Sequence, residues 1–272
     1  MDYVRAIQQL ISSLLKSSKN HALLIEGPPG WGKTTTVEKA LSNAEVHAAY
    51  LGSYSTPLNL YNFLHEHPDD TIVIDDCGGL FSDSASMAIL KSATWGTSTG
   101  KRIVRWGSTS SKAHSSDFEF RGKFIMICNH FPNTADGDAI RSRSFMRPIE
   151  LSVDEAKDLL SKAAKNRDWF SETKIAKKVV ALLSEHITDK TISKISYRTL
   201  EHGYELALHH PDDWEALLSP QLPKIELSPE ELVKSLAIRP LKIKDQFRIF
   251  SESTGLSRRT FFKYREANDL SK

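Results

Sequence analysis

Eight residues near the amino terminus have the types and spacing that bind phosphate groups. The segment Gly27-Pro28-Pro29-Gly30-Trp31-Gly32-Lys33-Thr34 matches G-x-x-x-x-G-K-[ST] between an apolar run and a helix-compatible stretch. Its glycines let backbone N–H groups turn toward phosphates, and the N-terminus of the next helix adds a positive potential. Lys33 would meet the β and γ phosphates and Thr34 would hold Mg²⁺. The sequence therefore predicts binding of ATP and Mg²⁺ by residues 27–34 and Thr35, whereas the alternative is an ordinary Gly/Pro turn.

An acidic pair follows about forty residues later. Residues 71–76 form an apolar run that ends in Asp75 and Asp76, and phosphoryl transfer needs such carboxylates beside the phosphate loop. Asp75 is predicted to position Mg²⁺ through its water shell, and Asp76 to orient or deprotonate the attacking water. That second position is more often Glu, so the shorter Asp76 side chain limits its reach.

The surrounding pattern predicts the elements that position these residues. Apolar runs at 22–26, 46–51, 71–75 and 124–128 indicate strands, and helical patterns occupy 2–17, 33–43, 57–66 and 83–94. This alternation predicts an α/β fold with a parallel sheet covered by helices on both faces. We expect three domains: an αβα nucleotide-binding core (1–150), a helical lid (151–220) that begins with a capping box at Ser152 and Glu155, and a helix-turn-helix module (224–272).

The order of these features resembles that of AAA+ P-loop ATPases over residues 20 to about 218. The strand 124–128 ends at Asn129, an Arg-Ser-Arg segment lies at 141–143, and a helix with Arg198 near its start follows in the lid. The resemblance implies that Asn129 is the first sensor, which polarises the attacking water. It also implies that Arg143 is the arginine finger of a neighbouring subunit, with Arg141 as the alternative, and that Arg198 is the second sensor at the γ-phosphate. Solvated cations on the surface are the other interpretation.

An insertion at about 98–123 separates the acidic strand from the Asn129 strand. Its alternating pattern predicts a β-hairpin, which resembles the hairpin of superfamily-3 helicases and other DNA-directed AAA+ motors. Four cations could follow a phosphate backbone while Trp106 stacks on a base. They are Lys101, Arg102, Arg105 and Lys112. The alternative is an exposed hairpin with Trp106 in a subunit contact.

Residues 247–265 have the spacing of a helix-turn-helix. Gly255 lies at the turn and Ser257 caps the second helix. Four cations are predicted on or near its exposed face, where they could reach phosphates or guanine edges. They are Arg258, Arg259, Lys263 and Arg265. Similar small bundles also bind proteins.

Composition limits the classes of partner. The formal net charge is only +2, but residues 101–123 carry six Lys/Arg against two acids and residues 224–272 carry eleven against seven. Any nucleic-acid surface would therefore lie in these two segments. The two cysteines, Cys77 and Cys128, end apolar runs without zinc-ligand spacing, so we expect both to be buried and reduced. Without an apolar signal core or an 18-residue apolar run, the protein is expected to be soluble and cytoplasmic, with no membrane partner.

The resulting hypothesis is an ATP-hydrolysing AAA+ motor that acts on DNA. We expect a homo-oligomeric ring or spiral, typically hexameric, because an arginine finger acts only at a subunit interface. A replication helicase or helicase loader of phage or mobile-element type, with a replication-protein partner, fits best. One alternative uses ATP only as an assembly switch, as in initiator or transposition-regulator ATPases. The other is a protein-remodelling ATPase whose C-terminal module binds an adaptor.

Overall fold

The computed structural model describes residues 3–52, 54–95, 100–107, 113, 115–223, 228–238 and 241–270. The chain divides into two compact units, residues 1–222 and 223–272, which are described separately. Within the described residues, no helix combines the length and the apolar character needed to cross a membrane.

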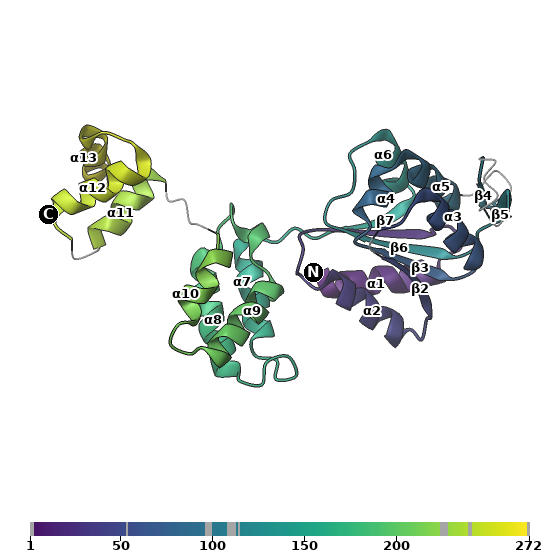
Figure 1. The fold of residues 1–272 in the computed structure, drawn as a ribbon, viewed down its shortest axis with the longest axis horizontal. Coiled ribbons are helices and arrows are strands. Elements are labelled where there is room, and N and C mark those ends of the chain that lie inside the picture. Colours follow the sequence, from purple (N-terminus) through teal and green to yellow (C-terminus); the bar gives the residue numbers. More distant parts are fainter. Residues whose placement is uncertain are drawn as a thin grey trace. The chain divides into compact units, whose positions relative to one another are not determined.

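A five-stranded parallel sheet lies at the centre of the first unit, in the order β2-β3-β6-β1-β7 (Figure 1). The strands are β1 (Ala22–Glu26), β2 (Ala48–Gly52), β3 (Thr71–Asp75), β6 (Lys123–Cys128) and β7 (Ser144–Pro148). The predicted strands are all present. The sequence pattern does not predict β7, because this strand at the edge of the sheet is only partly buried and has neither a continuous apolar run nor a strict alternation.

Helices cover both faces of the sheet, which confirms the predicted three-layer αβα fold (Figure 1). One face carries α1 (Tyr3–Lys16) and α2 (Lys33–Asn43). The other face carries α3 (Pro57–Glu66), α4 (Gly78–Ser82), α5 (Ser84–Thr94) and α6 (Ala135–Arg141). In β1, Leu23 and Ile25 pack toward the first face and Leu24 toward the second, as expected for a period of two.

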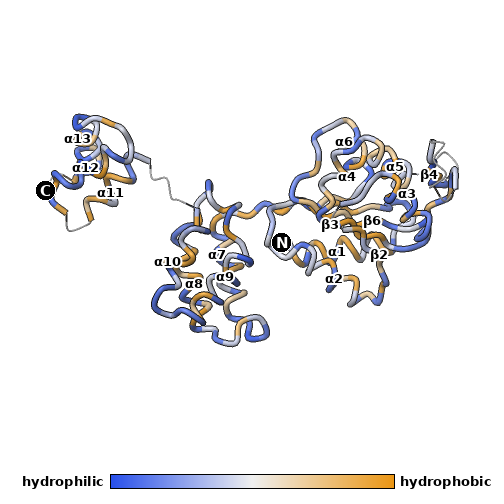
Figure 2. Tube along the Cα trace, viewed as in Figure 1, coloured by the Kyte–Doolittle hydropathy of each residue, from blue (hydrophilic) through white to orange (hydrophobic). Residues whose placement is uncertain are grey.

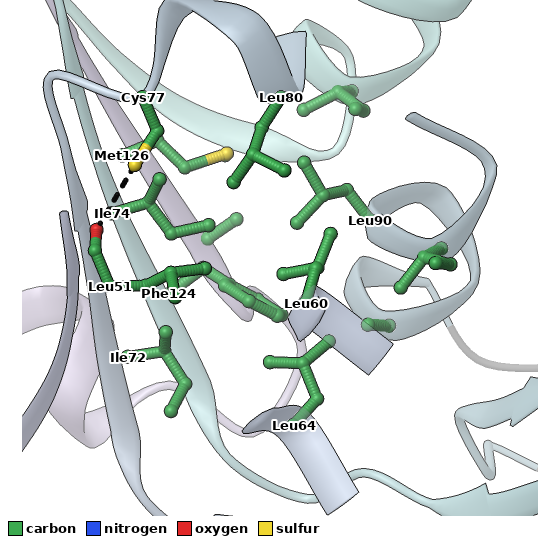
Figure 3. Close-up of a cluster of buried hydrophobic side chains, with 14 of the residues drawn as sticks. Leu51, Leu60, Leu64, Ile72, Ile74, Cys77, Leu80, Leu90, Phe124 and Met126 are labelled. Carbon is green, nitrogen blue, oxygen red and sulfur yellow. Dashed lines mark hydrogen bonds between the residues drawn. The ribbon is translucent and has the colours of Figure 1, made fainter. Parts of the chain in front are cut away.

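Both faces of the sheet are apolar, as a buried parallel sheet requires (Figure 2). Figure 3 shows the second face, where leucines of α3, α4 and α5 pack on Ile72, Ile74 and Phe124. Cys77 and Cys128 are buried here as predicted, and burial raises the pKa values of their thiols to about 11 and about 12. Neither cysteine is therefore a reactive thiolate at neutral pH.

The predicted hairpin is present between α5 and β6. Its strands, β4 (Ile103–Arg105) and β5 (Asp117–Glu119), pair antiparallel and form a separate two-stranded sheet. Most of the segment that joins them lies outside the described residues.

Residues 152–222 form a helical region with its own hydrophobic core, which corresponds to the predicted lid and is called the lid below. Its α-helices are α7 (Val153–Ala163), α8 (Thr173–His186), α9 (Tyr197–His209) and α10 (Trp214–Leu218), and its 3-10 helices are η1 (Ile192–Lys194) and η2 (Ser219–Gln221). The predicted capping box starts α7: the Ser152 N–H donates to Glu155 Oε2 at 2.9 Å, and the Glu155 N–H donates to Ser152 Oγ at 3.3 Å.

The second unit contains α11 (Pro229–Ile238), α12 (Ile243–Thr254) and α13 (Arg258–Ala267). They pack around Val233, Leu236, Phe250 and Phe261. Gly255 ends α12 with a left-handed backbone (φ 70°), and the Ser257 hydroxyl accepts a hydrogen bond from the Thr260 N–H at 3.3 Å. The helix boundaries around Gly255 therefore follow the sequence prediction.

We expect a pH-dependent loss of stability from His21, which directly precedes β1. Burial, and then the charges of Arg102 and Lys123, lower the pKa of His21 from 6.5 to about 4. Between these values the unfolded chain binds a proton that the folded chain does not. The contribution of His21 to the free energy of unfolding is therefore fully present above pH 6.5, and it is lost progressively as the pH falls toward 4.

His21→Gln tests this expectation in urea unfolding series at pH 7.5 and pH 5. The variant should lose less stability than wild type between the two pH values, whatever its stability at pH 7.5. The exposed His47 provides the control, His47→Gln, which should keep the wild-type pH dependence. An unchanged pH dependence in His21→Gln would contradict the assignment.

Candidate nucleotide-binding site

The predicted phosphate loop joins β1 to the N-terminus of α2. Gly30 and Gly32 both have left-handed backbones, with φ 78° and 72°, which residues with a Cβ rarely adopt. A Cβ at Gly30 would lie 2.3 Å from Ser196 Oγ, so this close approach also requires glycine. The loop leads into α2 at Lys33, where unpaired backbone N–H groups and the helix dipole favour an anion.

The Lys33 ammonium lies at the centre of the site. Nζ donates to the Gly27 carbonyl (2.7 Å), the Pro28 carbonyl (2.8 Å) and Asn129 Oδ1 (3.0 Å), and the side chain is buried. Burial lowers the pKa of Lys33, while Asp75 acts in the opposite direction. The structure thus brings together the loop lysine, the acidic strand end and Asn129, which are up to 96 residues apart in sequence.

Thr34 and Asp75 meet as the sequence analysis predicts. Thr34 Oγ1 donates to Asp75 Oδ2 at 2.6 Å. A hydroxyl and a carboxylate are hard oxygen donors of the kind that Mg²⁺ takes in nucleotide sites, so these two residues fit the predicted ion. Asp76 is exposed beside them with φ 53°, a backbone conformation uncommon outside glycine and found preferentially at functional sites.

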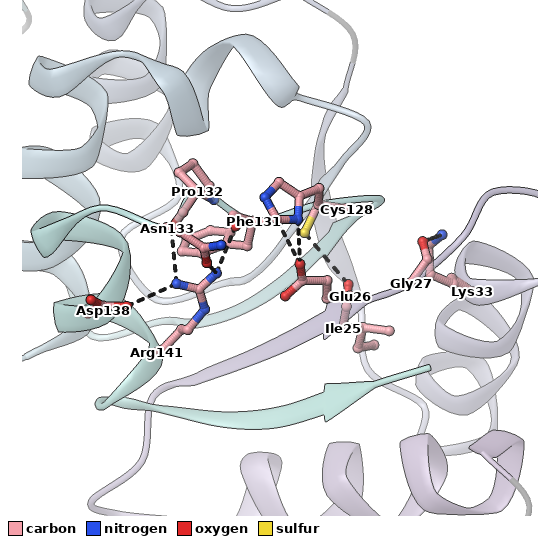
Figure 4. A network of polar contacts seen from close by, with 11 residues as sticks. Ile25, Glu26, Gly27, Lys33, Cys128, Phe131, Pro132, Asn133, Asp138 and Arg141 are labelled. Atoms are coloured by element: carbon pink, nitrogen blue, oxygen red, sulfur yellow. Dashed lines mark hydrogen bonds and ion pairs between the residues drawn. The ribbon is translucent and has the colours of Figure 1, made fainter. Parts of the chain in front are cut away.

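Glu26, which the sequence analysis did not identify, holds the segment after Asn129 (Figure 4). Glu26 Oε1 accepts from the Phe131 N–H at 3.0 Å and pairs with His130 Nδ1 at 3.1 Å. Glu26 ends β1, and its neighbour across the sheet, Cys128, ends β6. The sequence contained one signal for this role: Glu26 is an acidic residue at the end of a strand, directly before the phosphate loop.

Arg141 holds the same segment from the other side (Figure 4). Its guanidinium donates to the carbonyls of Phe131 (2.7 Å) and Pro132 (3.0 Å) and to Asn133 Oδ1 (2.9 Å). These intrachain hydrogen bonds occupy the guanidinium and favour a structural role for Arg141 over the alternative assignment as the arginine finger.

Lys33, Thr34, Asp75 and Asn129 line a cleft of about 840 Å³, a volume typical of a small-molecule site. The phosphate loop, α1, α2 and the lid all contribute to its walls. The predicted residues that line it are Pro29, Gly30, Trp31, Gly32, Lys33, Thr34, Thr35, Asp75, Asp76, Asn129 and Arg198, whereas Gly27 and Pro28 do not.

The lid contacts the phosphate loop through Trp31. The Trp31 indole is wholly buried, and its ring lies 5.0 Å from that of Tyr197 in an edge-on arrangement. Within the described residues, Trp31 is the one buried member of the lid core that comes from outside the lid. The Trp31 side chain therefore packs in the lid core, although the residue also lines the cleft. Arg198 is exposed in the cleft, near enough for its charge to lower the pKa of Lys33.

Arg143, the predicted arginine finger, lies between α6 and β7. Its guanidinium lies 5.7 Å from the centre of the Trp95 ring, and NH1 donates to the Lys91 carbonyl at 3.4 Å. Trp95 is more than half exposed and the Arg143 side chain is partly buried. Unlike that of Arg141, the Arg143 guanidinium has one long hydrogen bond to the chain among those described.

The hairpin differs from the prediction at two residues. Arg102 is 4% exposed, donates to the Ala93 carbonyl at 2.9 Å and lies over the Phe120 ring, so it cannot follow a DNA backbone. Trp106 packs against Tyr61 at 5.5 Å and is only partly exposed, so little of its ring is free for the predicted stacking on a base. Lys101 and Arg105 are exposed as predicted, whereas Lys112 lies outside the described residues.

The second unit contains one similar correction. Arg258, Arg259 and Lys263 are exposed on α13. Arg265 is 5% exposed, and its guanidinium donates to Gln246 Oε1 at 2.8 Å and to the Leu270 carbonyl. Arg265 therefore joins α13 to α12 within the module and does not lie on the exposed face where it was predicted.

Comparisons with known proteins support the fold. Neither protein-family models nor curated protein sequences match this chain. Among solved structures, domain III of the Thermotoga maritima replication initiation protein DnaA is similar, with a TM-score of 0.51 and 15% identity over 81% of this chain and 92% of that one. Cdc6p from Pyrobaculum aerophilum (TM-score 0.49, 13% identity, 98% and 84%) and a T. maritima RuvB mutant (0.47, 14%, 97% and 87%) were also found.

The fold is thus that of the AAA+ class of P-loop proteins, with a helical lid. At 15% identity the similarity to DnaA domain III shows a shared fold alone, so the function has to be argued from the residues of the site.

Proposed function

We propose that the protein binds ATP with Mg²⁺ and hydrolyses it, and that this activity serves work on DNA. The observation that carries the first part is the convergence of Lys33, Thr34, Asp75 and Asn129 in one cleft at the carboxyl edge of a parallel sheet. A structural turn would not require a buried lysine beside two carboxylates and a strand-terminal amide.

Each residue has a part in this proposal. The N–H groups of the phosphate loop and Lys33 bind the phosphate oxygens, and Arg198 adds charge from the lid. Thr34 and Asp75 would hold Mg²⁺, which neutralises phosphate charge when bound. Asp76 and Asn129 lie beside them in the cleft, where they can orient the attacking water. Glu26 and Arg141 hold the segment that carries Asn129.

The proposal includes a homo-oligomer. Arg143 does not line the cleft of its own subunit, so its proposed role in stabilising transition-state charge requires the nucleotide of a neighbour. A ring or open spiral, typically hexameric, places every arginine at such an interface.

DNA is proposed as the partner because two exposed cationic surfaces remain after the corrections above. One consists of Lys101 and Arg105 of the hairpin, and the other of Arg258, Arg259 and Lys263 of α13. The similar DnaA chain is a replication initiation protein by name. A helicase or helicase loader of phage or mobile-element type, with a replication-protein partner in the cytoplasm, is the specific form we favour.

A second candidate follows from Asp76. Because an aspartate reaches less far than the usual glutamate, hydrolysis can be slow and ATP can act mainly as an assembly switch. ATP-dependent oligomerisation with negligible DNA-stimulated turnover would favour this function.

A protein-remodelling ATPase with an adaptor-binding C-terminal module is the third candidate function. ATP turnover that is stimulated by protein but not by DNA would favour it.

Variants of the two cationic surfaces should have different effects in DNA-binding and ATPase assays. Lys101→Ala with Arg105→Ala should reduce DNA-stimulated ATP hydrolysis but spare duplex affinity. Arg258→Ala with Arg259→Ala should weaken duplex binding and flatten its dependence on log salt by about one unit for each lost phosphate contact. Binding isotherms on single-stranded and duplex DNA at two salt concentrations measure both effects.

Lys174→Ala with Lys177→Ala, which changes two lysines of α8 in the lid, is the charge-matched control. It should leave both binding and stimulation unchanged. If neither DNA-directed double variant differs from this control, the proposal of DNA as partner fails while ATP hydrolysis remains testable on its own.

A further inference from the structure

The loop between α7 and α8 brings an aromatic side chain, Trp169, into the wall of the nucleotide cleft. Asn166, Asp168 and Trp169 line the cleft together with the phosphate loop. These three residues come from the lid, between α7 and α8, whereas Lys33 and Thr34 begin α2.

The plane of the Trp169 ring is fixed from three directions. Its Nε1 donates to Glu201 Oε1 at 2.7 Å. The ring of Phe170, which is buried, stacks on it with a centroid distance of 5.4 Å and an interplanar angle of 12°. Tyr197 meets it edge-on at 5.1 Å, and the same Tyr197 contacts Trp31 of the phosphate loop.

These contacts leave one large apolar surface uncovered. Phe170 occupies one face of the indole, yet Trp169 is still 40% exposed while it lines the cleft. A tryptophan held by a hydrogen bond and two aromatic neighbours is already fixed, so its side chain loses little further conformational entropy when a ligand binds. A preorganised aromatic face in a polar cleft is suited to a flat, uncharged ring.

We propose that the exposed face of Trp169 stacks on the base of the bound nucleotide and favours purine nucleotides. This inference rests on the proposed nucleotide-binding function and names the residue that selects the base. A bicyclic purine covers more of an indole than a pyrimidine does, so its stacking is stronger. The phosphate loop holds the triphosphate irrespective of the base, so the affinity difference between nucleotides comes from the lid.

Isothermal titration with two compounds separates the base from the phosphates. Adenosine 5′-(β,γ-imido)triphosphate with Mg²⁺ reports base and phosphates together, and inorganic tripolyphosphate with Mg²⁺ reports the phosphates alone. Trp169→Ala should weaken the nucleotide on the order of tenfold and leave tripolyphosphate unchanged. Trp169→Phe, which keeps an aromatic face, should retain most of the affinity. The same titration with the cytidine analogue should show a smaller loss in Trp169→Ala.

Leu208→Ala is the matched control, since Leu208 is a lid residue of similar exposure (39%) that does not line the cleft. It should bind both compounds as wild type does. Equal nucleotide affinity in Trp169→Ala and wild type would overturn the inference, as would a loss that Trp169→Phe shares in full. If wild type binds neither compound, the proposed function itself fails, which is a distinct result.

Discussion

Lys33→Ala is expected to reduce affinity for Mg²⁺-ATP by about 10²- to 10⁴-fold and to abolish hydrolysis. The Lys33 ammonium donates hydrogen bonds to charged phosphate oxygens in the proposed complex, and such bonds contribute about 1.5–3 kcal/mol each. Two of them account for the expected loss, since about 1.4 kcal/mol corresponds to tenfold. Isothermal titration measures the affinity, and phosphate release measures the hydrolysis.

Thermal unfolding must accompany this experiment, because Lys33 also holds Gly27, Pro28 and Asn129 in the protein without nucleotide. Lys33→Met keeps the apolar stem and should lose binding to the same degree. Lys16→Met changes an exposed lysine of α1 that does not line the cleft and should leave the affinity nearly unchanged. ATP binding at wild-type strength in Lys33→Ala would falsify the phosphate-loop assignment.

Arg143→Ala is expected to leave ATP affinity nearly normal and to lower the hydrolysis rate by about 10³-fold or more, the size of arginine-finger effects in phosphoryl transfer. The physical reason is that the finger interacts with charge that develops only in the transition state. A selective loss in kcat, with binding intact, is therefore the signature to measure.

Arg141→Ala provides the contrast two residues away. Because the Arg141 guanidinium holds Phe131, Pro132 and Asn133, its loss should lower the free energy of unfolding by about 2 kcal/mol. Among the described contacts, the Arg143 guanidinium makes a single long hydrogen bond of 3.4 Å, so Arg143→Ala should have little effect on stability. Thermal unfolding of the two variants distinguishes these roles.

Mixing experiments test whether Arg143 acts between subunits. Arg143→Ala subunits retain the phosphate loop, and Lys33→Ala subunits retain the arginine. Mixed assemblies should therefore recover part of the activity that each variant lacks alone. Normal hydrolysis by Arg143→Ala alone would place the finger elsewhere, and failure of the mixture with intact oligomers would argue for a role within one subunit.

Local patterns in the sequence were sufficient for the core elements. β1, β3 and the phosphate loop have strong local signals: continuous apolar runs, a glycine-rich turn and a helix start at Lys33. The capping box at Ser152 likewise needs only residues three apart. Local sequence therefore determined the class of fold and most residues of the proposed phosphate site.

Tertiary structure decided which charged and aromatic side chains face solvent. Arg102 and Arg265 look like surface cations in sequence, yet each is buried where another part of the chain supplies acceptors: the Ala93 carbonyl for Arg102, and Gln246 and the Leu270 carbonyl for Arg265. Trp169 is the reverse case, an aromatic residue whose exposed face lines the cleft only because the lid packs on the phosphate loop through Trp31. Such partners are distant in sequence, and burial depends on their packing, so the pattern around each residue does not contain this information.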